Sequence, residues 1–142
     1  MYCRVKNYPI QEILDIVIDA SEIKELKCVK PTKKEYKVAI TRLVDGYAVK
    51  MDSLRYQCFK LKSTVCCHCG LKATHFGLEV EHCNMDVLVI PYHFNLYGIK
   101  NGKEVLFTKD HILPKSKQGK DVIENMQTMC TICNCKKGNK IE

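Results

Sequence analysis

Two pairs of cysteines constrain this chain more than any other feature. Cys66 and Cys69 form one Cys-x-x-Cys pair, and Cys130 and Cys133 form a second pair near the end of the sequence. Each pair offers two thiolates on one side of a tight turn, and zinc takes four such ligands in a closed tetrahedral site. We therefore predict one structural zinc ion with no open coordination position. The alternative, unpaired buried thiols, fits two such pairs in one short chain less well.

The other six of the ten cysteines lack this spacing. Free cysteine commonly behaves as a small buried hydrophobic residue, and we expect most of the six to lie in the core. Two of them adjoin the zinc pairs, but the regular spacing favours the four ligands named above. The six are Cys3, Cys28, Cys58, Cys67, Cys83 and Cys135.

The composition is that of a globular domain. The chain has 142 residues, of which 46% are hydrophobic and 27% charged, close to the averages for folded domains. No apolar run reaches the roughly 18 residues that a membrane helix needs, and the start of the sequence lacks the pattern of a secretory signal. We expect a cytoplasmic protein with no membrane partner, whose cysteines are metal ligands and free thiols rather than disulfides.

The net charge of +7 favours a nucleic acid as partner. Basic residues exceed acidic ones in residues 1–62 and 109–142, whereas residues 63–108 carry no such excess. The two ends of the chain are therefore basic and the middle is not.

Apolar periodicity and capping residues predict a helical N-terminal part. Thr32 and Glu35 have the spacing of a capping box, Asp45-Gly46 is interpreted as a helix stop, and Ser53 can cap a short helix. Tyr47 to Met51 is predicted to be extended. The predicted helices span residues 10–27, 33–44 and 53–61.

The middle of the chain predicts strands. Residues 75–82 alternate between apolar and polar, and residues 87–97 are rich in β-branched and aromatic side chains. Asn101-Gly102 between two such segments is a strong hairpin signal. A two-residue turn there would place His93 opposite Asp110 and Tyr92 opposite His111. His93 would then be an additional ligand or a partner of the site residues, whereas a lone histidine in a strand is usually structural.

The last third of the chain carries a cluster of motifs in a fixed order. Asp110-His111-Ile112-Leu113-Pro114 is followed by a lysine-containing loop, by Asn125, and by the second cysteine pair running into Asn134 and Lys137-Gly138. Together with the helix and cysteine pair that precede them, these motifs resemble the HNH endonucleases, also called ββα-metal or His-Me finger nucleases, in their four-cysteine zinc subgroup. The resemblance covers roughly residues 53–140.

The resemblance implies a fold and a division of the chain. We expect an α+β protein, in which a helical N-terminal extension (residues 1–52) precedes a nuclease domain (residues 53–142) made of a zinc-bracketed β-hairpin and a ββα-metal finger. Proteins of this kind occur in phages, mobile elements and restriction systems, so the expected location is the cytoplasm or nucleoid of a bacterial or phage-infected cell.

The resemblance also implies roles for four residues. His111 would be the general base that activates water, and Asn125 would position it. Asp110 and Asn134 would bind the catalytic divalent metal, and asparagine in place of the more common histidine makes this the HNN variant. Such oxygen ligands favour magnesium or manganese. Because neighbouring residues of a strand point to opposite faces, Asp110 and His111 can serve one phosphate only if the strand ends or bends there.

Lysines flank these residues on both sides and are predicted to contact DNA phosphates without reading bases. The N-terminal helices carry a second lysine cluster, for which DNA contact, dimerisation and simple support are alternatives. The first set is Lys115, Lys117, Lys120, Lys136, Lys137 and Lys140, and the second is Lys24, Lys27, Lys30, Lys33, Lys34 and Lys37.

The leading hypothesis is a metal-dependent HNH DNA endonuclease that nicks or cuts both strands. The alternative is a zinc-stabilised DNA-binding module that does not cleave, or that acts only as a subunit of a larger DNA-processing assembly. A ribonuclease or an RNA-binding protein is a third possibility, and a homodimer is possible.

Overall fold

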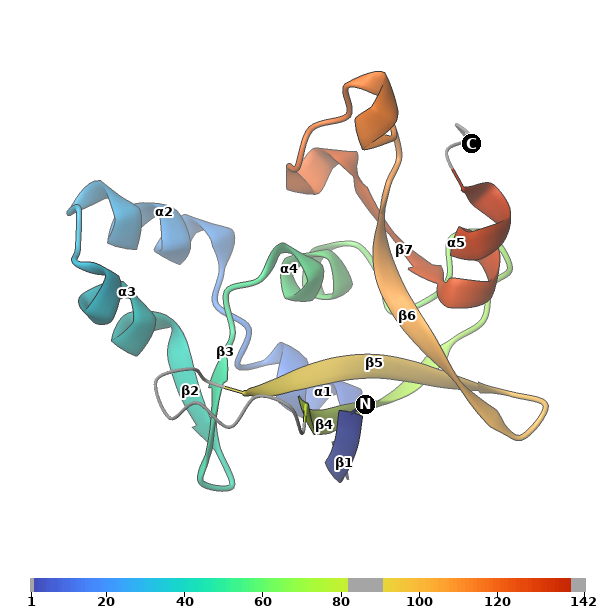
Figure 1. Ribbon diagram of the computed structural model, residues 1–142, viewed down its shortest axis with the longest axis horizontal. Coiled ribbons are helices and arrows are strands. Elements are labelled where there is room, and N and C mark those ends of the chain that lie inside the picture. The colour runs from blue at the N-terminus through green and yellow to red at the C-terminus, as the bar shows by residue number, and fades with distance from the viewer. Residues whose placement is uncertain (1, 82–90, 139–142) are drawn as a thin grey trace.

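The strands in the part of the chain that the structure describes, residues 2–81 and 91–138, form a seven-stranded sheet. In this computed structural model the strand order is β1-β4-β5-β3-β2, and β6 pairs with both β5 and β7 (Figure 1). Helices accompany the sheet, which confirms the predicted α+β class. The strands are β1 (Tyr2–Tyr8), β2 (Thr41–Val44), β3 (Tyr47–Lys50), β4 (Ala73–Glu81), β5 (Tyr92–Lys100), β6 (Lys103–His111) and β7 (Met126–Cys130).

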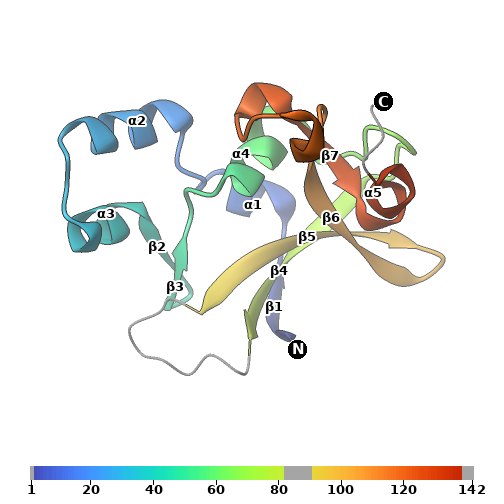
Figure 2. The ribbon, with the colours of Figure 1, turned by 45° about the horizontal axis from the view of Figure 1, so that its top comes forward.

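The helices fall into two groups. In both ribbon views α2 and α3 lie side by side, away from the sheet formed by β4, β5 and β6 (Figure 2). By contrast, α4 lies close to β6, and α5 lies beside β6 and β7 at the C-terminal end. Two single 3-10 turns interrupt the loop between β6 and β7. The helices are α1 (Ile10–Leu14), α2 (Ala20–Cys28), α3 (Lys33–Ile40), α4 (Leu54–Leu61) and α5 (Thr131–Lys137), and the 3-10 turns are η1 (Lys115–Lys117) and η2 (Ile123–Asn125).

The predicted helix over residues 10–27 is wrong as a continuous element, because it breaks between α1 and α2. Ile18, at the break, donates its backbone N–H to the carbonyl of Met51 at 3.0 Å, and its own carbonyl accepts a hydrogen bond from the Gln57 side chain. Val17 and Ile18 are both buried. Hydrogen bonds to distant residues thus replace the helical ones that the local pattern predicted.

The predicted helix over residues 33–44 ends early. The capping box at Thr32 is present and α3 begins at Lys33, but residues 41–44 form β2. Asp45 and Gly46 have φ angles of 51° and 84°, the left-handed pair that a two-residue hairpin requires. The Asp-Gly pair therefore joins β2 to β3 rather than ending a helix. The expected extended segment at Tyr47 is β3, and the short helix capped by Ser53 is α4.

Strand pairing crosses the expected domain boundary at residue 52. The unpredicted strand β1 pairs antiparallel with β4, and β3 pairs parallel with β5 at Val49 and Tyr92. The N-terminal segment thus contributes strands to the sheet of the C-terminal segment. The division into two domains at this position stays a prediction.

The hairpin between β5 and β6 turns at Asn101-Gly102 as predicted, with Lys100 opposite Lys103. The residues predicted to be extended, 75–82 and 87–97, lie partly in β4 and β5, and residues 82 and 87–90 fall outside the described part. The inferred register of His93 and Asp110 is wrong. β6 separates from β5 beyond Leu106 and pairs with β7, so Asp110 lies opposite Gln127.

Aromatic side chains fill the core between α4 and the sheet. Phe59 of α4, Phe76 of β4 and Phe94 of β5 are essentially fully buried, and the ring centroids of Phe76 lie 6.2 Å from Phe59 and 6.1 Å from Phe94. Phe107 of β6 extends this core. Gly98 permits its approach, because a Cβ atom there would lie 3.0 Å from the Phe107 ring.

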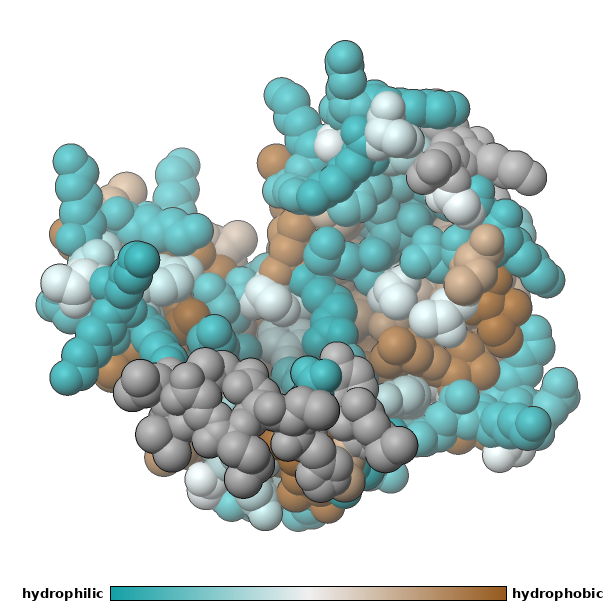
Figure 3. All heavy atoms as spheres, viewed as in Figure 1, coloured by the Kyte–Doolittle hydropathy of each residue, from teal (hydrophilic) through white to brown (hydrophobic). Residues whose placement is uncertain are grey.

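The surface is largely hydrophilic on the face shown in Figure 3. Hydrophilic residues cover much of α2 and α3, and the surface is hollowed between these helices and β6. None of the helices in the described residues has the length and apolar character needed to span a bilayer.

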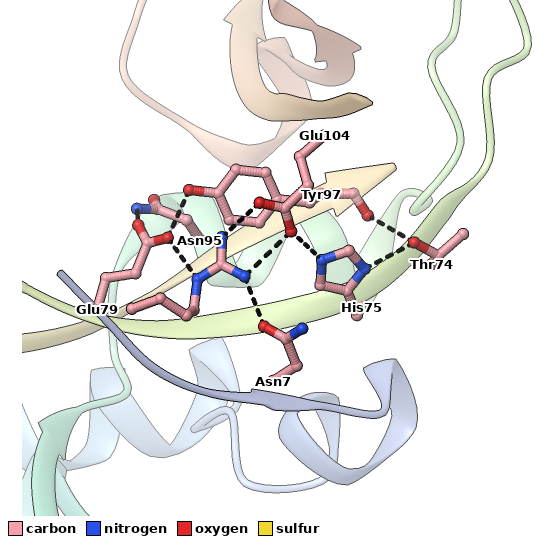
Figure 4. A network of polar contacts seen from close by, with 8 residues as sticks. Asn7, Thr74, His75, Glu79, Asn95, Tyr97 and Glu104 are labelled. Carbon is pink, nitrogen blue, oxygen red and sulfur yellow. Dashed lines mark hydrogen bonds and ion pairs between the residues drawn. The ribbon is translucent and has the colours of Figure 1, made fainter. Parts of the chain in front are cut away.

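A polar network on the face of the sheet that points away from the core joins β1 to its neighbours (Figure 4). The Arg4 guanidinium donates to Glu79 at 2.8 Å and to Glu104 at 2.9 Å, which ties β1 to β4 and to the hairpin. Glu79 also accepts from Asn95 and Tyr97. Burial opposes ionisation of Glu79, but these three donors outweigh it and lower its pKa. Gly77 leaves room for Arg4, whose side chain a Cβ atom would overlap.

Candidate functional site

The four predicted zinc ligands come together. The sulfur atoms of Cys66, Cys69, Cys130 and Cys133 all lie within 4.8 Å of one another. The first pair sits on the turn between α4 and β4, where the backbone N–H of Gly70 donates to the carbonyl of Cys66. The second pair spans the junction of β7 and α5. A metal here would join the C-terminal helix to a turn that precedes the sheet.

The electrostatics of this cluster suit a cation. Burial opposes ionisation of Cys66, but backbone N–H groups outweigh it and lower its pKa to about 6. Burial and the neighbouring sulfur groups raise the pKa of Cys130, and they raise that of Cys133 to about 12. Four thiolates this close together need a shared positive charge, and four sulfur donors are a zinc-type set.

The expectation that most of the other cysteines are buried is wrong. Only Cys58 among those described is in the core, where it contacts Thr128. Cys28 and Cys135 lie towards the ends of helices and Cys67 lies in a turn, and these positions face solvent. Cys28, Cys67 and Cys135 are exposed, Cys3 is half-buried, and Cys83 lies outside the described residues.

Asp110 is buried near the end of β6, where its carboxylate faces α5. It accepts hydrogen bonds from Gln127 at 2.9 Å and from the Lys137 ammonium at 2.5 Å. The ammonium also donates to the backbone carbonyl of His111. The predicted contact between Lys137 and DNA is therefore wrong in this structure, because the side chain is 1% exposed. A buried carboxylate requires such a counter-charge.

Asn134 lies one helical turn before Lys137 on α5 and faces the same side of β6. Its Nδ2 donates to Thr108 at 3.2 Å, and Thr108 and Asp110 share one face of the strand. Within the described residues, the second carboxylate oxygen of Asp110 and the amide oxygen of Asn134 accept no hydrogen bond. These two hard oxygen donors fit a divalent cation such as magnesium, which commonly keeps several water ligands.

His111 is the last residue of β6 and points away from Asp110, as alternation along the strand requires. Its Nε2 lies 2.5 Å from an oxygen of Asp121, and the other oxygen of Asp121 accepts from Lys115 at 2.8 Å. The hydrogen bonds from Lys115 and then His111 lower the pKa of Asp121 to about 2. The carboxylate is thus ionised at neutral pH and fixes which ring nitrogen of His111 carries the proton.

Asp121 is the functional candidate that sequence analysis missed. It lies ten residues after His111, and no spacing rule joins the two. The available signal was a single acidic residue at the end of an otherwise basic loop, Lys115 to Lys120.

Asn125 organises the loop that carries Asp121. Its Oδ1 accepts from the backbone of Leu113 at 2.8 Å, and its Nδ2 donates to the carbonyls of Leu113 and Lys120 at 3.0 Å. Gly119 packs so closely on Leu113 that a Cβ atom would overlap its carbonyl. Asn125 contacts the loop, not the His111 ring, so any effect on His111 passes through these bonds.

The remaining predicted DNA-binding lysines differ in their environments. Lys115 is exposed but pairs with Asp121. Lys117, Lys120 and Lys136 are exposed on the loop and on α5, and Lys140 lies outside the described residues.

β6 and β7 form an antiparallel pair that α5 follows, and Asp110, His111 and Asn134 lie where these three elements meet. Residues 98–140 match the family model of the HNH endonucleases, and the family resemblance predicted from the sequence is thereby confirmed for this segment. A search of the curated proteins and a search of the solved structures found no match for the chain. The match to an HNH domain indicates a nuclease-type function.

Proposed function

We propose that the protein is a DNA endonuclease that hydrolyses phosphodiester bonds, with His111 as general base and one divalent metal held by Asp110 and Asn134. The observation that carries the proposal is the hydrogen bond between His111 and Asp121 at the end of β6. It leaves the other ring nitrogen, Nδ1, without a hydrogen bond in the described part of the chain. A proton on Nε2 and a lone pair on Nδ1 form a base that can deprotonate water near neutral pH.

The oxygen donors of Asp110 and Asn134 would hold magnesium or manganese. When bound, the cation would neutralise negative charge on the phosphate under attack and on the leaving oxygen. His111 and Asp110 point to opposite faces of β6, but β6 ends at His111 and the chain bends at residues 112–113. The phosphate would therefore lie at the end of the strand, where side chains from both faces of β6 can contact it.

Asp121 and Asn125 would act as positioning residues. Asp121 orients the His111 ring, and Asn125 holds the loop on which Asp121 lies. Exposed Lys117, Lys120 and Lys136 surround this junction and would bind neighbouring phosphates. The same proposal assigns the four-cysteine site to zinc, which would hold α5 and hence Asn134 in place.

Cleavage of supercoiled plasmid tests this function. Purified protein that retains zinc should convert the plasmid to relaxed or linear DNA when magnesium or manganese is present. Once zinc loading has been verified, addition of EDTA should abolish this cleavage. The His111→Ala variant should leave the plasmid supercoiled. Cleavage that is equal in wild type and variant would refute the role of His111.

A non-cleaving, zinc-stabilised DNA-binding module is the second candidate, alone or within a larger assembly. It is favoured by the Lys137 ammonium, which already neutralises the carboxylate that would bind metal. Protein that binds DNA and retains zinc, but leaves plasmid intact with every divalent metal tested, would establish this alternative.

A further inference from the structure

A cavity of about 480 Å³ lies outside the proposed catalytic junction. Its walls come from four elements: the end of β3 at Lys50, the start of α4 at Arg55, the start of β5 at His93, and β6 at Lys109. It therefore lies where the N-terminal segment meets the HNH segment. Figure 3 views the face on which the surface is hollowed between α2 and α3 on one side and β6 on the other.

The charges around this cavity are mostly positive. Lys50, Arg55 and Lys109 line it with a single carboxylate, Asp52, which accepts a hydrogen bond from Tyr36. Burial, followed by the charge of Arg55, lowers the pKa of His93, which disfavours a positive charge on the imidazole.

Two of the three cations are available to a ligand. Arg55 is committed to the protein, since it donates to the Asn95 side chain and to the carbonyl of Phe94, both at 2.6 Å. By contrast, Lys50 and Lys109 make no hydrogen bond or ion pair within the residues that the structure describes. Lys109 is also half-buried, and an unpaired ammonium in such a position is costly unless something anionic covers it.

Lys109 connects the cavity to the candidate base. Alternation along β6 places Lys109 and His111 on the same side of the strand, about 6.6–6.8 Å apart along it. A polyanion that presents one charge at His111 can therefore present another at Lys109. Exposed lysines of α2 and α3, namely Lys24, Lys27, Lys33 and Lys34, add further positive charge to the N-terminal segment.

We propose that this cavity is a backbone subsite for DNA, in which Lys50 and Lys109 bind phosphates flanking the one at His111. The choice of DNA as ligand rests on the proposed function, whereas the cationic subsite does not depend on cleavage. The N-terminal segment then acts as part of the DNA-binding surface through Lys50, and not only as support for the sheet.

Salt-dependent binding without catalysis tests the proposal. The probe is a fluorescently labelled DNA duplex of arbitrary sequence, and anisotropy is measured in EDTA at several KCl concentrations with zinc-loaded protein. Each phosphate contact contributes about 0.9 to the slope of log K against log salt. Lys50→Gln and Lys109→Gln should each reduce the slope by about that amount and weaken binding about 8-fold at 0.1 M salt. Lys109→Arg should restore most of the loss.

The matched control is Lys72→Gln, which removes an exposed lysine beside the first cysteine pair. It should leave slope and affinity unchanged, and all variants should retain zinc and the wild-type Tm. Unchanged slopes for Lys50→Gln and Lys109→Gln would overturn the subsite, as would the absence of any DNA binding by wild type. Tighter binding of a matched RNA duplex, with the same dependence on both lysines, would overturn DNA as the occupant.

Cleavage is scored separately. If wild type fails to cut plasmid but both lysine variants lower the salt slope, the subsite is supported and the nuclease proposal fails. If wild type cuts and the slopes do not change, the nuclease proposal stands and the subsite fails.

Discussion

The ammonium nitrogen of Lys137 lies 2.5 Å from a carboxylate oxygen of Asp110, with both side chains buried. The pair joins α5 to β6 at the point where the candidate catalytic groups meet. Lys137 also donates to the carbonyl of His111, so a single cation fixes both neighbouring residues of the strand end. The positive charge of Lys137, which sequence analysis assigned to DNA contact, therefore neutralises a buried carboxylate inside the protein.

Removing this cation should destabilise the fold strongly. Lys137→Met leaves the Asp110 carboxylate buried without its counter-charge, and breaking a buried pair in this way costs about 3–5 kcal/mol. Urea unfolding of the zinc-loaded protein measures the loss. Lys136→Met, at the exposed neighbouring position, should change the free energy of unfolding by no more than about 0.5 kcal/mol. Equal stability of the two variants would show that Lys137 does not hold Asp110.

Asp121 should matter for the rate of cleavage and not for DNA affinity. Asp121→Asn keeps the size of the side chain but removes the charge that orients His111, and loss of such alignment typically costs about 100-fold in rate. Single-turnover cleavage and anisotropy binding separate the two effects. Asp121→Glu should recover part of the rate. A matched loss of affinity and rate would instead make Asp121 a structural support for the loop.

Zinc removal should unfold the C-terminal module. Cys69→Ser removes one of four ligands from a site that joins α5 to the first cysteine turn, and we expect the variant to lose zinc and cooperative thermal unfolding. Elemental analysis should find one zinc per wild-type chain. Cys135→Ser, at an exposed cysteine next to the site, should retain zinc and the wild-type Tm. Well under one zinc per wild-type chain would refute the structural site.

Stability should fall in acid through the network around Arg4. The pKa of Glu79 and of Glu104 is lowered from 4.5. Carboxylates with depressed pKa contribute stability that is present above the unfolded pKa and is lost as pH falls through the folded value. The free energy of unfolding should therefore decline below about pH 4.5. Glu79→Gln should be less stable at pH 7 and show a shallower decline, and an unchanged pH dependence would exclude Glu79 as a contributor.

Local signals predicted the parts of the fold that depend on local geometry. The Asn101-Gly102 hairpin, the Thr32 capping box and the four-cysteine cluster need only neighbouring residues or paired spacings, and all are present. The strand β1 was missed because its pairing partner, β4, lies far along the chain. The break at Ile18 is set by hydrogen bonds to residues in later elements.

The candidate site was predictable to a similar extent. The order of the motifs identified Asp110, His111 and Asn134 as candidates, but it did not identify the residues that they contact. The hairpin register suggested that His93 faces Asp110, and this was wrong because β6 exchanges β5 for β7 beyond Leu106. The contact of His111 with Asp121 depends on how an irregular loop folds, which no periodic pattern encodes.

The most direct test of the proposed nuclease is the single-turnover cleavage rate of a labelled DNA duplex by wild type and His111→Ala. Both proteins must contain one zinc and bind the duplex equally in EDTA, so that only chemistry differs. With magnesium or manganese, loss of the general base should reduce the rate by about 10²- to 10⁴-fold. A rate for His111→Ala within about 2-fold of wild type, where the general base alone should supply 10² or more, would contradict the proposed mechanism.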